Sequence, residues 1–152
     1  MTALEKIRSW LATFPDFDIL SSFSVDYIDR AVPNNAGIFP DGLVEVERRR
    51  DIMGNSTVTN QYNFGIYGVF AKPPGDDVGA VINADWVSGF QEWVQAQSVT
   101  GDAPTFGDVP NAEKITAQNG MLYDTGEGTA TYMVQLSVQF KKKFEVKNPW
   151  LI

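Results

Sequence analysis

The chain has 152 residues, 43% of them hydrophobic and 20% charged, which is typical of one ordinary globular domain with a hydrophobic core. It contains no cysteine and no histidine. These absences exclude disulfides, thiolate nucleophiles, Ser-His and Cys-His dyads, and the usual zinc and iron ligand sets. The net charge of -7 argues against a free-standing nucleic-acid binder, because affinity for phosphates comes largely from lysine and arginine.

The apolar segments are short, and none approaches the length of about 20 residues that spans a bilayer. The N-terminus also lacks the basic segment and apolar block of a signal peptide. We therefore expect a protein that is not membrane-bound and that stays in the cytoplasm. We also expect a single domain over residues 1–152.

The first predicted element is a helix from Ala3 to Phe14. Thr2 and Glu5 have the spacing of a capping box, and apolar residues then fall on one helical face. Alternating apolar and polar residues predict a strand over Ser21–Ile28. The following segment, Ala31–Gly42, is rich in proline, glycine and asparagine, which favours a loop with only a short extended piece at 37–39.

A long β-hairpin is predicted next, from Leu43–Ile52 and Val58–Phe70, with a turn at residues 53–57. If Ile52 faces Val58, apolar residues nearer the base of the hairpin also face each other, which favours this register. In that register Val46 faces Phe64 and Val44 faces Ile66, while Arg50 faces Asn60 and Arg48 faces Tyr62.

Asn83 is a candidate N-cap for a second helix that reaches Gln97, with three aromatic residues along one side. A loop over 101–110 and a strand over Ala112–Tyr123 follow, and residues 124–128 have the composition of a hairpin turn. The most regular pattern in the chain is Ala130–Phe140, where apolar residues occupy every second position from Tyr132. We predict an α+β fold with a single antiparallel or mixed sheet of about four or five strands. Two helices would pack on this sheet, and a long hairpin would protrude from it.

Several charged or aromatic groups are candidates for functional sites. Glu45 and Glu47 are expected on one strand face, and Asp76-Asp77 in a loop, where acids usually face solvent rather than metal or substrate. The lysines at 141–143 follow the strand predicted at Ala130–Phe140, which favours a solvated strand end over a phosphate site. Trp86 and Trp93 have helical spacing and are expected in the core, and residues 126–128 join two strands, so they do not form a phosphate loop. We therefore expect no catalytic residues, no metal ligands and no cofactor.

The outer half of the predicted hairpin is the candidate interface. It is too polar to join the core, and an isolated two-stranded ribbon is marginal in water, so a partner surface would explain its length. The alternative is an exposed edge strand protected by charge, with the arginines paired to acids on the same ribbon. The candidate oligomer-interface residues are Arg48, Arg49, Arg50, Asp51, Asn60, Gln61 and Asn63.

The order helix, strand, long hairpin, helix, hairpin resembles a family of phage and prophage minor structural proteins of the tail-terminator, or head-to-tail completion, type. The resemblance covers nearly the whole chain and has no invariant chemical motif. It is carried by the helix and strand at Leu4–Phe14 and Phe23–Tyr27 and by two hairpins, Gly42–Val46 with Asn63–Phe64 and Asn119–Asp124 with Tyr132–Leu136.

The resemblance implies a non-enzymatic virion protein. Several copies, six in the lambda-type terminators, would form a ring at the end of the tail tube next to the head connector, where the ring stops tube polymerisation and lets DNA pass. The implied partners are other copies of the chain, the tail tube protein and head connector proteins, with no sequence-specific nucleic acid and no membrane. The implied location is the tail of the virion, and the host cytoplasm during assembly. The alternative is a small acidic ligand-binding domain, or a hydrolytic domain that uses a carboxylate pair.

Overall fold

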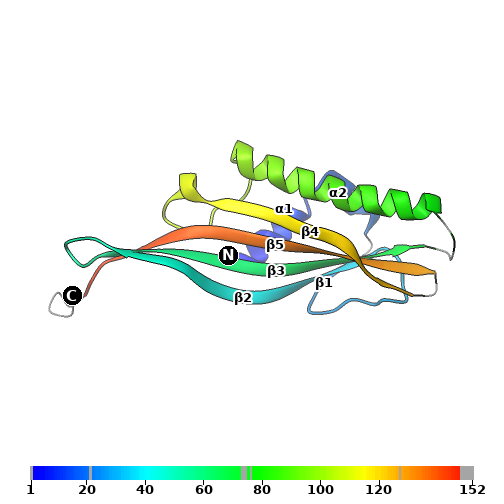
Figure 1. The fold of residues 1–152 in the computed structure, drawn as a ribbon, viewed down its shortest axis with the longest axis horizontal. Helices are drawn as coiled ribbons and strands as arrows, with labels where there is room; N and C mark the ends of the chain where they lie inside the picture. Colours follow the sequence, from blue (N-terminus) through cyan, green and yellow to red (C-terminus); the bar gives the residue numbers. More distant parts are fainter. Residues whose placement is uncertain (1, 21, 73–74, 76, 127, 148–152) are drawn as a thin grey trace.

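A single five-stranded mixed sheet organises the protein in the computed structural model, which describes residues 2–20, 22–72, 75, 77–126 and 128–147. The strand order is β1-β2-β3-β5-β4, and two helices pack beside the sheet (Figure 1). This arrangement confirms the predicted α+β fold with a long β2–β3 hairpin. The elements are α1 (Ala3–Leu11), β1 (Ser22–Val25), β2 (Asn35–Arg50), β3 (Ser56–Ala71), α2 (Asp77–Thr100), β4 (Lys114–Thr125) and β5 (Thr129–Phe144).

Helix α1 begins at the predicted capping box, in which Thr2 and Glu5 each bond the backbone of the other. The helix ends at Leu11, earlier than predicted, because the chain tightens there into turns of i to i+3 type. The amide of Phe14 donates to the carbonyl of Leu11, and a 3-10 helix, Pro15–Ile19, follows. Proline suits the start of that short helix because it offers no amide hydrogen and its φ is already set.

The prediction of a loop over residues 31–42 holds only for residues 31–34, because β2 already begins at Asn35 and runs through Pro40. β1 pairs with the first four residues of β2 in parallel and is shorter than predicted. The chain between them crosses β2 at Gly37, where a side chain would collide with the carbonyl of Tyr27. The glycine that suggested a loop is therefore needed for close packing against a strand.

The predicted register of the β2–β3 hairpin is also wrong. Ile66 faces Ile38, and Val58 faces Arg48, whereas the prediction placed Ile66 opposite Val44. The turn lies at residues 51–55, where the amide of Asp51 donates to the carbonyl of Asn55. Two irregularities in β2, at residues 40–42 and 45–47, shift the register by one residue each. Bulges of this kind are invisible to a search for matching apolar pairs.

Helix α2 begins at Asp77, so the prediction that Asn83 caps it is wrong. Asn83 instead lies in the helix interior, is buried, and donates a hydrogen bond of 3.3 Å to the carbonyl of Ala71 at the end of β3. α2 runs alongside β4 (Figure 1), where Gln91 donates to the carbonyl of Ala117 and Ser98 accepts from the amide of Ile115. Among the described residues, no helix has the length and apolar character needed to cross a membrane.

The core lies between the helices and one face of the sheet. β5, the strand with the most regular predicted pattern, supplies a row of buried residues on that face, with Leu136 and Val138 fully enclosed. α1 and α2 meet through aromatic contacts: Trp10 stacks on Trp93 at 4.9 Å between ring centroids and donates to Gln97. The α2 tryptophans, Trp86 and Trp93, were predicted to be core residues; they are partly buried and pack against the core.

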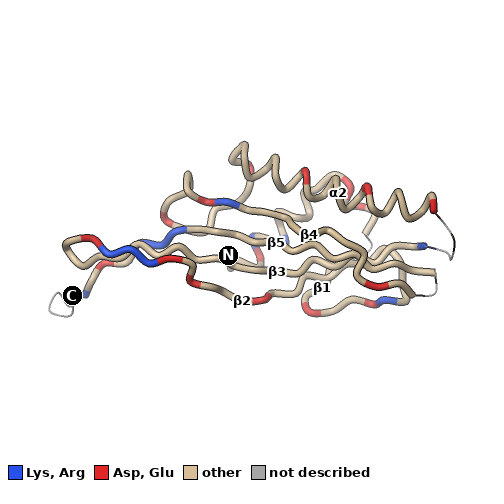
Figure 2. The backbone as a smooth tube through the Cα atoms, viewed as in Figure 1, with Lys and Arg blue, Asp and Glu red and all other residues tan. Residues whose placement is uncertain are grey.

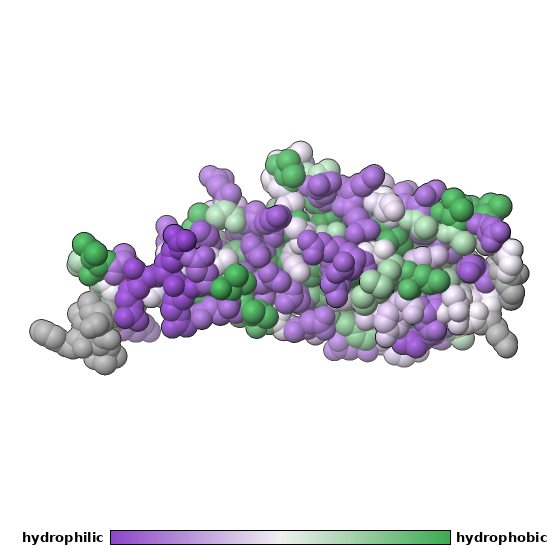
Figure 3. Space-filling model, in the orientation of Figure 1, coloured by the Kyte–Doolittle hydropathy of each residue, from purple (hydrophilic) through white to green (hydrophobic). Residues whose placement is uncertain are grey.

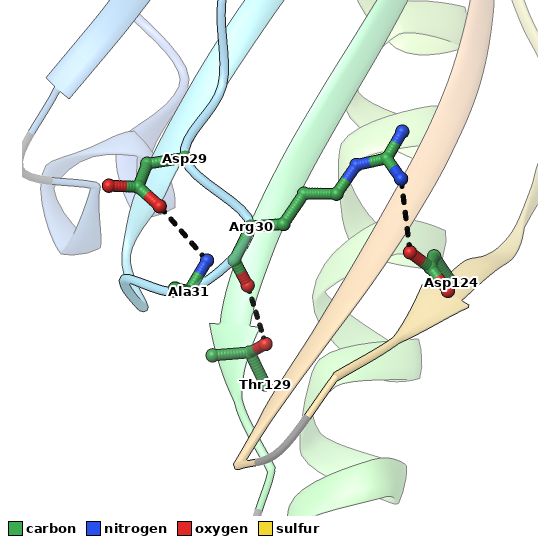
Figure 4. A network of polar contacts seen from close by, with 5 residues as sticks. All are labelled: Asp29, Arg30, Ala31, Asp124 and Thr129. Carbon is green, nitrogen blue, oxygen red and sulfur yellow. Dashed lines mark hydrogen bonds and ion pairs between the residues drawn. The ribbon is translucent and has the colours of Figure 1, made fainter.

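The opposite face of the sheet is covered at one end by the chain that links β1 to β2. Figure 4 shows how this segment is held: Arg30 reaches Asp124 of β4 at 3.1 Å, and the hydroxyl of Thr129 donates to the carbonyl of Arg30 at 2.7 Å. The guanidinium of Arg30 also lies 5.5 Å from the ring centroid of Tyr123. These contacts tie the β1–β2 connection to the β4–β5 hairpin, which leaves the rest of that face open.

Candidate interaction surface

Three strands extend beyond the helices at the other end of the molecule. β4 pairs with β5 only as far as Gln139, whereas β3 pairs with β5 as far as Phe144 and with β2 as far as Arg50. We call this extension, residues 45–60 and 139–147, the basic arm (Figure 1). The prediction of an isolated two-stranded ribbon is therefore wrong, because β5 adds a third strand, which stabilises such a projection more than two strands can.

Basic residues cross the arm on both outer strands, with β3 between them. Arg48 and Lys142 both face Val58, and Arg49 and Lys143 both face Thr57. Figure 2 shows these residues in blue near one end of the elongated molecule. We call them the basic belt: Arg48, Arg49, Arg50, Lys141, Lys142 and Lys143. The arginines were predicted as interface residues and the lysines as a solvated strand end. The structure brings the two groups together, and only the β3–β5 pairing could have indicated this.

Two of the three arginines bind acids on their own strand. Arg48 lies 2.7 Å from Glu45, and Arg49 bonds Glu47, which raises the pKa of the arginine through the hydrogen bond and the charge. Glu45 faces Asn60 and Glu47 faces Thr59, so the irregularity between the two acids places them on opposite faces of the sheet. The prediction that they share one face is wrong. Exposed pairs of this kind contribute little to stability.

The remaining cations of the belt are not neutralised in this way. Among the residues that the structure describes, Arg50, Lys141, Lys142 and Lys143 form no ion pair with an acid. The arm contains seven lysines and arginines and four acids, a net charge of +3. The rest of the chain contains five bases and 15 acids, a net charge of -10. The molecule is therefore strongly polarised in charge.

The tip of the arm is apolar. Ile52 is 98% exposed and Met53 is 68% exposed, and Figure 3 shows apolar atoms at the tip next to the hydrophilic belt. Asp51, another predicted interface residue, shapes this turn: its carboxylate accepts hydrogen bonds from the amides of Met53 and Asn55. Asp51 therefore shapes the turn that presents the two apolar side chains.

The three predicted interface residues on β3 are half-buried, and only Asn60 lies within the arm, while Gln61 and Asn63 follow it in the strand. Gln61 donates to Asn63 at 2.7 Å, and each of the two accepts a hydrogen bond from β5. They form part of a neutral amide and hydroxyl surface on the face away from the helices. Asn60 faces the other way and lines a hollow of about 310 Å³ with Glu45 and Arg48.

The outer edge of β5 is capped by a loop that sequence reasoning did not single out. The amide of Asp108 donates to the carbonyl of Lys141 at 2.8 Å, and its carboxylate accepts from the amide of Lys143 at 2.9 Å. Gly107 is needed for this close approach, since a side chain there would collide with the Lys141 carbonyl. The cap satisfies edge groups that would otherwise attract another strand.

The described part of the chain offers little for catalysis. No three acidic residues there are close enough together to hold a metal ion, and Asp76 of the predicted acid pair lies outside the described residues. The apolar void under α2 has a volume of about 20 Å³, which is enough for one water molecule at most. A larger groove of about 840 Å³ between α2 and β4 is open to solvent and lined by a mixture of polar, charged and apolar side chains, among them Gln91, Glu92, Lys114 and Ile115.

The chain was compared with known proteins at the level of sequence. No protein-family model matches it, and a search of curated proteins finds no match. Its function is therefore interpreted from the geometry of the arm and from the charge distribution.

Proposed function

We propose that this protein is a non-enzymatic subunit of a homo-oligomeric ring in a phage or prophage virion, with the role of a tail terminator or head-to-tail completion protein. The observation that carries the proposal is the basic arm. Three strands project beyond the helices, most of the outer part of β2 is exposed, and the tip presents two apolar side chains to solvent. Apart from Val58 and Phe140, which are buried, the arm adds little to the core of its own chain, so a neighbouring surface explains it better.

The open sheet face fits the same role. Its middle part presents neutral side chains from three neighbouring strands, among them Thr116, Gln61, Ser137 and Gln139, with one lysine, Lys114, beside them. A surface of this type, turned toward the lumen of a ring, neither binds DNA phosphates tightly nor repels them strongly. The proposed partners are further copies of the chain, the tail tube protein and the head connector. The proposed locations are the virion tail and, before assembly, the host cytoplasm.

The alternative of a ligand-binding or hydrolytic domain has no comparable support. Glu45 and Glu47 face opposite sides of the sheet and each binds an arginine. A carboxylate pair that performs acid–base chemistry needs both groups at one cleft. We therefore favour an assembly role.

Two measurements test the proposed function. Light scattering over a wide range of protein concentrations should show association into a ring of defined size, and a strict monomer at every concentration would contradict the proposal. Deletion of the gene from a phage or prophage that carries it should then give heads without tails and tubes of uncontrolled length. A wild-type copy supplied on a plasmid should restore joined particles, while normal particles from the deletion strain would exclude the role.

A further inference from the structure

The outward side of α2 is unusually apolar for a surface that faces water. Val78, Val81 and Ile82 are 72%, 59% and 62% exposed, and their spacing places them together on the first turns of the helix. The buried residues of α2, such as Phe90 and Val94, lie on the other side. A helix that is apolar on both sides is normally covered on both sides.

The charges on α2 are all negative. Its 24 residues include Asp77, Asp85 and Glu92 but no lysine or arginine. Asp85 lies on the same side as the exposed valines, and Glu92 follows it at two helical turns. The outward side of α2, which we call the acidic helix face, is thus an apolar patch followed by acids. Figures 1 and 2 show that α2 runs from the end of the molecule opposite the arm, where its first turns lie, back toward the middle.

We infer that the acidic helix face is the docking site for the basic arm of a second copy of this chain. The inference rests on the proposed ring and names the two surfaces that would build it. The arm has an apolar tip followed by cations, and the helix face has an apolar patch followed by anions. With the tip at Val81, the basic belt lies over Asp85 and Glu92.

The spacings along the two elements also agree. Arg49 and Ile52 are three residues apart, so the belt lies at most about 10 Å from the tip along the arm. Along the axis of α2, Asp85 lies about 6 Å and Glu92 about 16 Å beyond Val81, so the belt would lie between the two acids. Because the two surfaces differ and lie toward opposite ends of the molecule, the contact is head-to-tail. Contacts of that type close into rings or continue as filaments.

Charge reversal tests the pairing. Lys142→Glu/Lys143→Glu makes the arm acidic, and Asp85→Lys/Glu92→Lys makes the helix face basic. Each variant alone should associate only at concentrations at least about tenfold higher than wild type. An equimolar mixture should recover the wild-type oligomer, because each arm then meets a face of opposite charge. Lys6→Glu/Lys72→Glu is the matched control outside the arm and the acidic helix face, and it should associate normally.

Introduced cysteines test the place of contact, since the natural chain has none. Met53→Cys/Val81→Cys should give cross-links between chains with a short bismaleimide. Met53→Cys/Val99→Cys, with an exposed site about 27 Å further along α2, should not. Both variants should retain the wild-type melting temperature.

The outcomes separate the two proposals. If wild type forms a ring, but the mixture does not recover the oligomer and the Val81 cross-link does not form, the pairing of arm and helix face is wrong. The proposed ring would then be retained. If α2 reversal alone blocks assembly and arm reversal does not, the face binds another part of its neighbour, which also overturns the inference. A wild-type chain that is monomeric at every concentration overturns both proposals.

Discussion

Phe64 of β3 and Leu136 of β5 face each other directly across the two central strands, and both are buried, with 4% and 0% of their surface exposed. The pair lies on the side of the sheet that the helices cover, within the cluster that includes Val94 of α2. Both residues were expected in the core from the alternating pattern of their strands.

Replacement of either residue by alanine should destabilise the protein. Each truncation loses buried area and leaves a cavity, which costs about 2–5 kcal/mol in the free energy of unfolding. Urea denaturation measures this. Leu43→Ala is the control, because Leu43 is 51% exposed in β2 and its truncation should cost no more than about 0.5 kcal/mol. Equal effects at all three sites would mean that the sheet does not present this face to the helices.

Reversal of Arg48 and Arg50 to glutamate should impair assembly and leave the fold intact. Both side chains are on the surface of the arm, and the exposed pair that Arg48 forms with Glu45 contributes little to stability. The melting temperature should stay near that of wild type, while light scattering should show loss of the ring. An unchanged oligomer, or wild-type particles in a complementation test, would show that these two arginines are not part of the interface.

Asp108→Ala should loosen the edge of β5. The carboxylate of Asp108 accepts a hydrogen bond from the amide of Lys143, and loss of one such bond costs about 1 kcal/mol. Hydrogen exchange at the Lys143 amide should become faster, while exchange at Val134 in the middle of the strand should not change. Asp108→Asn keeps an acceptor oxygen and should preserve most of the protection. Fast exchange in wild type already would show that the cap does not form in solution.

Two tyrosines predict how stability depends on pH at the alkaline end. Burial raises the pKa of Tyr132, and burial followed by the charges of Tyr123 and Asp41 raises the pKa of Tyr67. In the unfolded chain a tyrosine ionises at about pH 10, whereas in the folded chain these two ionise at a higher pH. Above about pH 10, ionisation therefore stabilises the unfolded state relative to the folded state. The contribution of these groups to the free energy of unfolding should therefore be fully present below about pH 10 and should decrease as the pH rises further.

Urea denaturation from neutral to alkaline pH measures this decline. Tyr67→Phe and Tyr132→Phe should each make it shallower, because phenylalanine has no proton to lose. Tyr27→Phe is a suitable control, since Tyr27 is 60% exposed. A decline that is the same in wild type and in the two variants would show that neither hydroxyl is responsible.

The sequence by itself determined the features that depend on local periodicity and on composition. The capping box of α1, the aromatic core side of α2 and the alternating pattern of β5 can all be recognised from neighbouring residues, because side-chain direction repeats every two residues in a strand and every 3.6 in a helix. From these elements the α+β class follows. The absence of cysteine and histidine restricted the available chemistry in the same direct way.

The strand register, the capping of the sheet edge and the clustering of charges depend on the tertiary structure. The irregularities in β2 moved Glu45 and Glu47 to opposite faces, and the crossing chain at Gly37 turned an expected loop into a strand. The belt that joins Arg49 to Lys143 depends on both residues facing Thr57, although they lie 94 positions apart in the chain. Strand pairing is set by contacts between distant segments, so local patterns do not contain it.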